Sequence, residues 1–207
     1  MEMERITREL MKTIDEKDEL RERALRETRE IVRTSRETIN AIHAGHSSVD
    51  GLKEAVKKIK ELKEALKEHN DVLYSGYVQT AAQELTEASL FQRYVNGEDA
   101  PKPVEICVEA TDYLLGLCDF TGELRRHMLH SLISGDMAGA EKDYGTIEEI
   151  YRAMAPADYP RGLINLKQKI DACRAIMERS LEDLTRAKQN SELKEEINRL
   201  LSGRSSS

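Results

Sequence analysis

Residues 3–44 read MERITRELMKTIDEKDELRERALRETREIVRTSRETINAIHA, and this stretch decides the fold class. Its apolar residues recur at the three- and four-residue spacing of one face of an α-helix. They are Ile6, Leu10, Ile14, Leu20, Leu25, Ile31, Val32, Ile39 and Ile42. The stretch predicts a single helix, ended by Gly45 and roughly 60 Å long. Because such a helix is longer than a small bundle, we expect a partner subunit to cover the excess.

Helical periodicity continues through the rest of the chain, without a strand pattern or an internal repeat. Further helices are predicted over 49–69 (capped by Ser47 or Ser48), 71–96, 104–134, 136–154 and 161–190, with a short one starting at Ser191. The short loops between them favour antiparallel neighbours. The sequence therefore predicts an all-α fold, a single bundle of about seven helices, forming one domain over residues 1–202 with a disordered tail over 203–207.

The composition narrows the class of protein. Of 207 residues, 34% are charged and 4% aromatic, which is typical of long helices and excludes a disulfide scaffold or a many-stranded β protein. The formal net charge of −7 counts against a protein that coats nucleic acid through an overall basic surface. Three cysteines without zinc spacing indicate reduced thiols and a cytoplasmic protein. No apolar run approaches the roughly 18 residues that span a bilayer, so we expect no membrane contact.

Two stretches of the chain are unusually poor in charge. Between Val72 and Gln92 the only charged side chains are Glu84 and Glu87, where the chain average of 34% would place about seven. Between Tyr113 and Leu124 the only ones are Asp119 and Glu123. Residues three or four apart share one face of a helix. Each stretch therefore carries a pair of carboxylates on an otherwise apolar face: the first acidic pair (Glu84, Glu87) and the second acidic pair (Asp119, Glu123).

A carboxylate in apolar surroundings is costly unless it is paired, protonated or bound to a cation. Oxygen ligands favour Mg²⁺ or Mn²⁺, and such ions activate water for phosphodiester hydrolysis. A di-iron bundle would need Glu-x-x-His motifs, which this sequence lacks. The alternative to a metal site is that the four carboxylates pair with Arg or Lys from other helices. Gly116 and Gly122 weaken the helix beside the second acidic pair and predict a close approach by backbone or ligand.

The same two stretches carry a family resemblance. GYVQTAAQELTEASLFQ at residues 76–92 and YLLGLCDFTGELRR at residues 113–126 resemble segments of the translin/TRAX family. Residues 21–43 fit as well, and Tyr151 and residues 163–167 fit more loosely. The resemblance covers most of the chain. It implies a seven-helix α-fold that assembles into rings or shells, often octamers, and binds RNA or single-stranded DNA.

The two branches of that family differ in chemistry. TRAX-type subunits carry acidic residues for metal-dependent RNA cleavage, whereas translin-type subunits mainly bind. Because this sequence keeps TRAX-like acids at Glu84, Glu87, Asp119 and Glu123, the resemblance implies the catalytic branch in a self-assembling, prokaryotic-type form. We therefore expect a cytoplasmic homo-octameric endoribonuclease in which these four residues are the catalytic residues and the ligands of Mg²⁺ or Mn²⁺.

Basic residues near the acidic pairs are candidates for contacts with RNA phosphates. They are Arg93, Arg125, Arg126 and His127, with Lys102 nearby. Their alternative role is as salt-bridge partners or as part of a solvated helix face. Two rival functions stay open at this point. One is a non-catalytic, translin-like binder of RNA or single-stranded DNA whose acids pair with arginines, and the other is a helical scaffold without a role in nucleic-acid binding.

Overall fold

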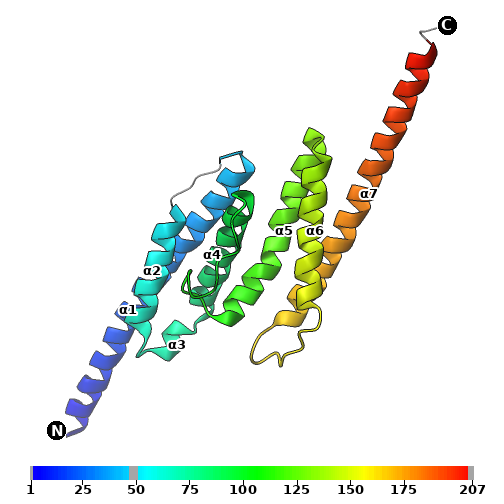
Figure 1. Cartoon of the computed structure of the whole chain (residues 1–207). Coiled ribbons are helices and arrows are strands. Elements are labelled where there is room, and N and C mark those ends of the chain that lie inside the picture. The colour runs from blue at the N-terminus through cyan, green and yellow to red at the C-terminus, as the bar shows by residue number, and fades with distance from the viewer. Residues whose placement is uncertain (1, 47–50, 205–207) are drawn as a thin grey trace. The chain divides into compact units, whose positions relative to one another are not determined.

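A computed structural model describes residues 2–46 and 51–204 of the chain (Figure 1). Within these residues it contains seven helices and no strand, which confirms the expected all-α class. The helices are α1 (Glu2–His43), α2 (Gly51–Leu66), α3 (Asn70–Leu73), α4 (Gly76–Val95), α5 (Ala110–Ser134), α6 (Met137–Met154) and α7 (Leu166–Arg204). The expected cap at Ser47 or Ser48 lies outside the described residues. Of the expected tail, residues 203 and 204 belong to α7, and residues 205–207 lie outside the described part.

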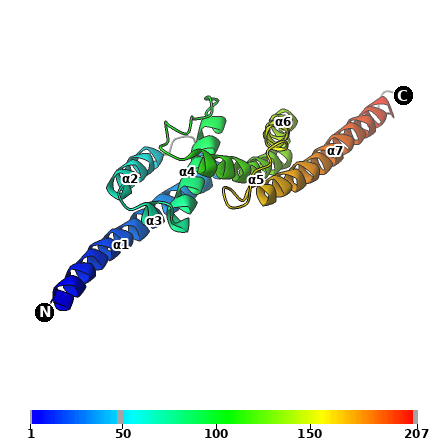
Figure 2. The same ribbon diagram turned by 90° about the horizontal axis from the view of Figure 1, so that it is seen from below.

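The chain divides into two compact units, Met1–Leu117 and Cys118–Ser207, which we describe separately. In the first unit α1 packs against α2 and α4, and α2 also contacts α3 and α4. One buried cluster of this unit consists of Ala24, Leu62, Leu66, Val72 and Val78. The N-terminal half of α1 extends past α2 and α4 (Figures 1 and 2). The first unit thus contains three helices that contact one another, α1, α2 and α4, and α1 extends beyond the other two (Figure 1).

In the second unit the later turns of α5 pack with α6 and α7. Met128, Ala140 and Leu184, one from each helix, form a buried cluster. The predicted start of a helix at Asp136 is confirmed, because the Gly139 amide donates to the Asp136 carboxylate over 2.9 Å and so caps α6. The C-terminal half of α7 extends past α6 (Figure 1).

Two predicted helix boundaries are wrong in the first unit. The helix expected over 71–96 is split at Tyr74 and Ser75 into α3 and α4. Ser75 is extended (φ −71°, ψ 149°), and its hydroxyl donates to the Val72 carbonyl over 2.6 Å. The helix expected from residue 104 begins only at Ala110. Cys107 between them has φ 57°, a left-handed conformation that ends any helix started earlier.

Two further boundaries are wrong in the second unit. The helix expected from residue 161 begins only at Leu166. The helices expected over 161–190 and from Ser191 are a single helix, α7. The polar residues around Ser191 include neither Gly nor Pro, and polarity alone does not stop a helix.

All three cysteines are free, and Cys118 and Cys173 are buried. Among the described residues, no helix has the length and hydropathy needed to cross a bilayer.

Candidate functional site

The first acidic pair lies on α4, with both carboxylates half-buried. Its neighbours Ala81, Leu85 and Ala88 are fully buried, so α4 turns an apolar face to the core beside these acids. Arg36 of α1 binds Glu84 through two hydrogen bonds. Its Nη2 donates to Oε1 over 2.6 Å and its Nε donates to Oε2 over 3.2 Å. Glu84 is therefore held by a bidentate guanidinium from the neighbouring helix.

Both acids of the first pair raise the pKa of the Arg36 guanidinium. Its hydrogen bond to Glu84, together with the charges of Glu84 and Glu87, raises the pKa of Arg36. The Glu84 side chain is 20% exposed and that of Arg36 is 63% exposed, so water reaches the guanidinium more freely than the carboxylate. The pair is consequently partly screened, and a competing cation or anion can reach it from solvent.

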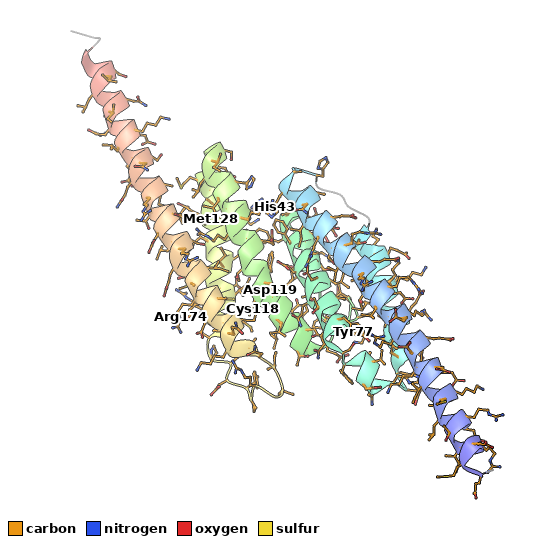
Figure 3. The ribbon with its side chains drawn as sticks, turned by 180° about the vertical axis from the view of Figure 1, so that it is seen from behind. His43, Tyr77, Cys118, Asp119, Met128 and Arg174 are labelled. Carbon is orange, nitrogen blue, oxygen red and sulfur yellow. The ribbon has the colours of Figure 1, made fainter. Side chains whose placement is uncertain are left out.

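The second acidic pair lies on the part of α5 that belongs to the second unit. The Lys169 ammonium of α7 donates to both oxygens of Asp119, over 2.5 and 2.7 Å. Arg126 lies one turn after Glu123 on the same helix, with its Nη1 3.9 Å from the carboxylate. Figure 3 labels Asp119 on α5 beside the buried Cys118. A hydrogen bond with Cys173 and burial raise the pKa of that thiol, as is usual for an unreactive buried cysteine.

One member of each acidic pair is therefore bound to a basic residue of another helix, as the non-metal alternative predicts. Among the described residues, no three His, Cys, Asp or Glu side chains form a metal-binding group. The donor atoms nevertheless suit a hard divalent ion, because each unit presents two carboxylates on one helix face in partly apolar surroundings. A divalent ion at Glu84 or Asp119 would have to displace the Arg36 guanidinium or the Lys169 ammonium.

The candidate phosphate contacts all have acidic neighbours within their own unit. Arg93 lies 3.2 Å from Glu98 and 3.6 Å from Glu105. In the second unit Arg125 donates to Ser180 over 3.2 Å and to Asp183 over 2.6 Å. Arg126 is the neighbour of Glu123 described above.

His127, the fourth candidate, contacts a buried acid. Its Nδ1 lies 2.7 Å from Oδ2 of Asp143, which is 1% exposed. This hydrogen bond raises the pKa of His127 against the opposing effect of burial. Arg125, Arg126 and His127 occupy consecutive positions on α5, so they form the most concentrated basic segment beside the second acidic pair.

The close approach expected at Gly116 is confirmed, and the one expected at Gly122 is not. A Cβ atom on Gly116 would lie 2.6 Å from the Gln83 carbonyl oxygen and 2.7 Å from Cβ of Thr86. A Cβ on Gly122 meets nothing within 4 Å in the described part of the chain. Gly116 thus lets α5 contact the α4 segment that carries the first acidic pair. Near this contact Gln83 donates to the buried Asp112 over 3.4 Å, and burial raises the pKa of Asp112.

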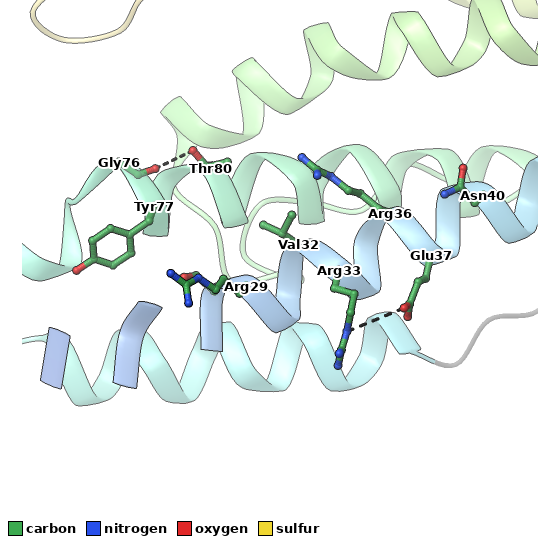
Figure 4. Close-up of a pocket in the computed structure, with 10 residues that line it drawn as sticks. Arg29, Val32, Arg33, Arg36, Glu37, Asn40, Gly76, Tyr77 and Thr80 are labelled. Atoms are coloured by element: carbon green, nitrogen blue, oxygen red, sulfur yellow. Dashed lines mark hydrogen bonds and ion pairs between the residues drawn. The ribbon is translucent and has the colours of Figure 1, made fainter. Parts of the chain in front are cut away.

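A cavity of about 560 Å³ opens between α1 and the start of α4 (Figure 4). We call it the α1–α4 groove. It is lined by Thr28, Arg29, Val32, Arg33, Arg36, Glu37, Asn40, Gly76, Tyr77 and Thr80. Sequence reasoning missed this groove and also missed Arg36 and Lys169. Arginine and glutamate alternate along residues 21–37, so nothing in the spacing distinguishes Arg36 from its neighbours.

Comparison with known proteins shows the family to which the chain is related. The model of the translin family matches residues 19–184. An uncharacterized protein of Methanocaldococcus jannaschii is 32% identical over 132 residues, which is 63% of this chain. The match spans 59% of that relative's length.

Solved structures of C3PO proteins resemble the chain as a whole. AfC3PO in complex with duplex RNA is 32% identical, with a TM-score of 0.72 over 89% of this chain and 97% of the other. AfC3PO alone gives a TM-score of 0.71 at the same identity and coverage. Apo-NeC3PO shares the fold, with a TM-score of 0.77 over 87% of this chain and 96% of the other at 19% identity.

Proposed function

Because the chain belongs to the translin family, we propose that it binds RNA and cleaves it as a metal-dependent endoribonuclease of the catalytic, TRAX-like branch. The observation that carries the proposal is the pair of half-buried carboxylates on each of two otherwise apolar helix faces. RNA as the partner is supported by AfC3PO, which is 32% identical and has been solved with duplex RNA.

In this proposal Glu84, Glu87, Asp119 and Glu123 hold Mg²⁺ or Mn²⁺, which when bound supplies an activated water and stabilises charge on the phosphoryl group. The chain's own contribution is to hold carboxylates of this set in place before the ion binds. Arg36 does so at Glu84 and Lys169 does so at Asp119. Both cations are partly exposed and lie within reach of a phosphate oxygen once they leave the carboxylate.

The proposal extends to the surroundings of the acids. Arg93, Arg125, Arg126 and His127 exchange their acidic neighbours for RNA phosphates when the strand binds, which is the role of residues that position a backbone rather than read bases. The protein acts in the cytoplasm, away from membranes.

We further propose a homo-oligomer, with an octamer as the expected size, that encloses the RNA. Its support is the apolar surface that the protruding helix ends leave exposed. On α1 these residues are Met3, Ile6, Leu10, Met11 and Ile14, and on α7 they are Leu193, Ile197, Leu200 and Leu201. Exposed apolar stripes of this kind mark sites of association.

A second function has a specific observation in its favour. Glu84 and Asp119 are bound to Arg36 and Lys169, which is the pairing expected of structural acids in a non-catalytic protein. The alternative is therefore a translin-like protein that binds RNA or single-stranded DNA without cutting it.

A single experiment separates the two functions. Labelled single-stranded RNA is incubated with the wild type and with the Glu84→Gln/Glu87→Gln variant in Mg²⁺, in Mn²⁺ and in chelator, and both cleavage and retention are measured. The enzyme predicts cleavage by the wild type in metal only, and none by the variant. RNA that is retained but uncut in every metal establishes the binder. Glu148→Gln on α6, far along the chain from both acidic pairs, is the matched control and should cut as the wild type does.

A further inference from the structure

The α1–α4 groove has the size and the walls of a ligand site. Its volume of about 560 Å³ falls within the range of roughly 300–1,000 Å³ found for small-molecule pockets. Val32 and the half-buried Tyr77 supply apolar surface, and the guanidinium groups of Arg29, Arg33 and Arg36 come from one side of α1. Figure 4 shows Arg29 directed toward Tyr77 and Arg36 directed toward α4.

The groove keeps positive charge although the chain as a whole carries −7. Arg33 reaches Glu37 only over 4.0 Å, with both side chains 69% exposed, so that pair is weak. Arg36 is bound to Glu84. Within the described residues, Arg29 has no carboxylate within 4.0 Å, so its charge is the one available to an anion.

The start of α4 adds to the positive electrostatic potential of the groove. The first intrahelical bonds of α4 come from the amides of Val78 and Gln79, which leaves the Gly76 and Tyr77 amides ahead of them. The Ser75 hydroxyl donates to the Val72 carbonyl and does not cap the helix. The positive end of a 20-residue helix therefore faces the same groove as the arginines.

We propose that the α1–α4 groove binds one nucleotide of the RNA strand next to the cleavage site, with its phosphate on Arg29 and its base against Tyr77 and Val32. Guanidinium groups match phosphate oxygens, and a tyrosine ring accepts the face of any base. Arg36 links the groove to the acidic site, because the same guanidinium lines the groove and binds Glu84. The inference rests on the proposed RNA binding and adds the place where the flanking nucleotide lies.

The test is equilibrium binding of labelled single-stranded RNA to the full-length protein in chelator, measured by fluorescence anisotropy over a series of salt concentrations. Removing one phosphate contact lowers the slope of log affinity against log salt by about 0.7 for a single strand. Arg29→Gln should show this change together with an affinity loss of about fivefold at moderate salt. Lys60→Gln is the control, because Lys60 is an exposed cation of α2 in the same unit and does not line the groove, and it should keep the wild-type slope.

Location is tested with the same RNA carrying 4-thiouridine, cross-linked by light and mapped by mass spectrometry. The proposal expects a cross-link on the peptide that contains Tyr77, reduced in Arg29→Gln. Equal slopes for Arg29→Gln and Lys60→Gln, or cross-links that all map elsewhere, overturn the groove while wild-type binding keeps RNA as the partner. A wild type that binds no RNA at all overturns both proposals. A groove cross-link without cleavage in any metal supports the groove and contradicts only the nuclease.

Discussion

At the scale of single residues, Arg36 and Lys169 occupy the oxygens of two candidate catalytic acids, Glu84 and Asp119. Each holds a carboxylate by two hydrogen bonds, and each comes from a helix distant in sequence. In the proposed nuclease, a divalent ion would compete with these basic residues for the same carboxylate oxygens. The four acids could be proposed from the sequence because the lack of other charges around them is visible there. Their partners were not found, because Arg36 is one of many arginines in its helix and Lys169 lies in an ordinary charged stretch.

This competition gives a prediction for Arg36→Gln. Removing the guanidinium frees the Glu84 carboxylate, so the affinity of the protein for Mn²⁺ should rise about fivefold, the effect of a partly exposed ion pair. Calorimetric titration of Mn²⁺ into the RNA-free protein measures it, with Arg33→Gln as the control on the same helix. Unchanged or weaker Mn²⁺ binding by Arg36→Gln would show that Glu84 is not a ligand.

The contact between His127 and Asp143 predicts a dependence of stability on pH. The pKa of His127 is raised in the folded protein. Its contribution to the free energy of unfolding is therefore complete below the unfolded pKa of about 6.5 and is lost as pH rises through the folded pKa. The free energy of unfolding that His127→Gln loses, about 1 kcal/mol because the His127 ring is partly exposed to water, should therefore be larger at pH 6 than at pH 9. Urea unfolding of both proteins at the two pH values measures it. An equal loss at both would mean that the ring stays neutral.

At the scale of elements, the contact between α4 and α5 rests on Gly116. Gly116→Ala places a methyl group against the backbone and side chain of α4, and should destabilise the protein by about 1–3 kcal/mol. Gly122→Ala is the matched control on the same helix. It meets no described atom within 4 Å and should stabilise the protein by up to about 1 kcal/mol through helix propensity. Urea midpoints that move in the same direction for both variants would contradict this role of Gly116.

The helices themselves were predictable where the chain uses strong stop and start signals. Gly45, with φ 87°, ends α1, and Asp136 caps α6, both as expected. Weaker signals misled. The break at Ser75 occurs inside an apolar stretch whose periodicity predicts one helix. In residues 104–109, Ile106 and Val108 are buried on either side of Cys107, whose left-handed conformation no local sequence pattern predicts. Tertiary packing determines where these helices break or begin, and the periodicity of the sequence alone does not reveal that packing.

At the scale of the whole molecule, the protruding end of α1 predicts association. Ile6, Leu10 and Ile14 lie on successive turns and are 40%, 60% and 65% exposed. Replacing all three with Gln should reduce the mass of the assembly, measured by light scattering after size exclusion. Arg8→Gln/Lys12→Gln, on the same segment, should leave the mass unchanged. An undiminished assembly of the apolar triple variant would place the interface elsewhere.

The central claim is that both acidic pairs serve one metal-dependent reaction on RNA. The most direct measurement is the rate of RNA cleavage in Mn²⁺ by the wild type, Glu84→Gln and Asp119→Asn, each shown to be folded and to have the wild-type mass. Because each substitution removes a proposed metal ligand from a different pair, we predict that both variants lose activity by about 100-fold or more, and that chelator abolishes cleavage by the wild type. Cleavage at the wild-type rate by either variant would contradict the claim.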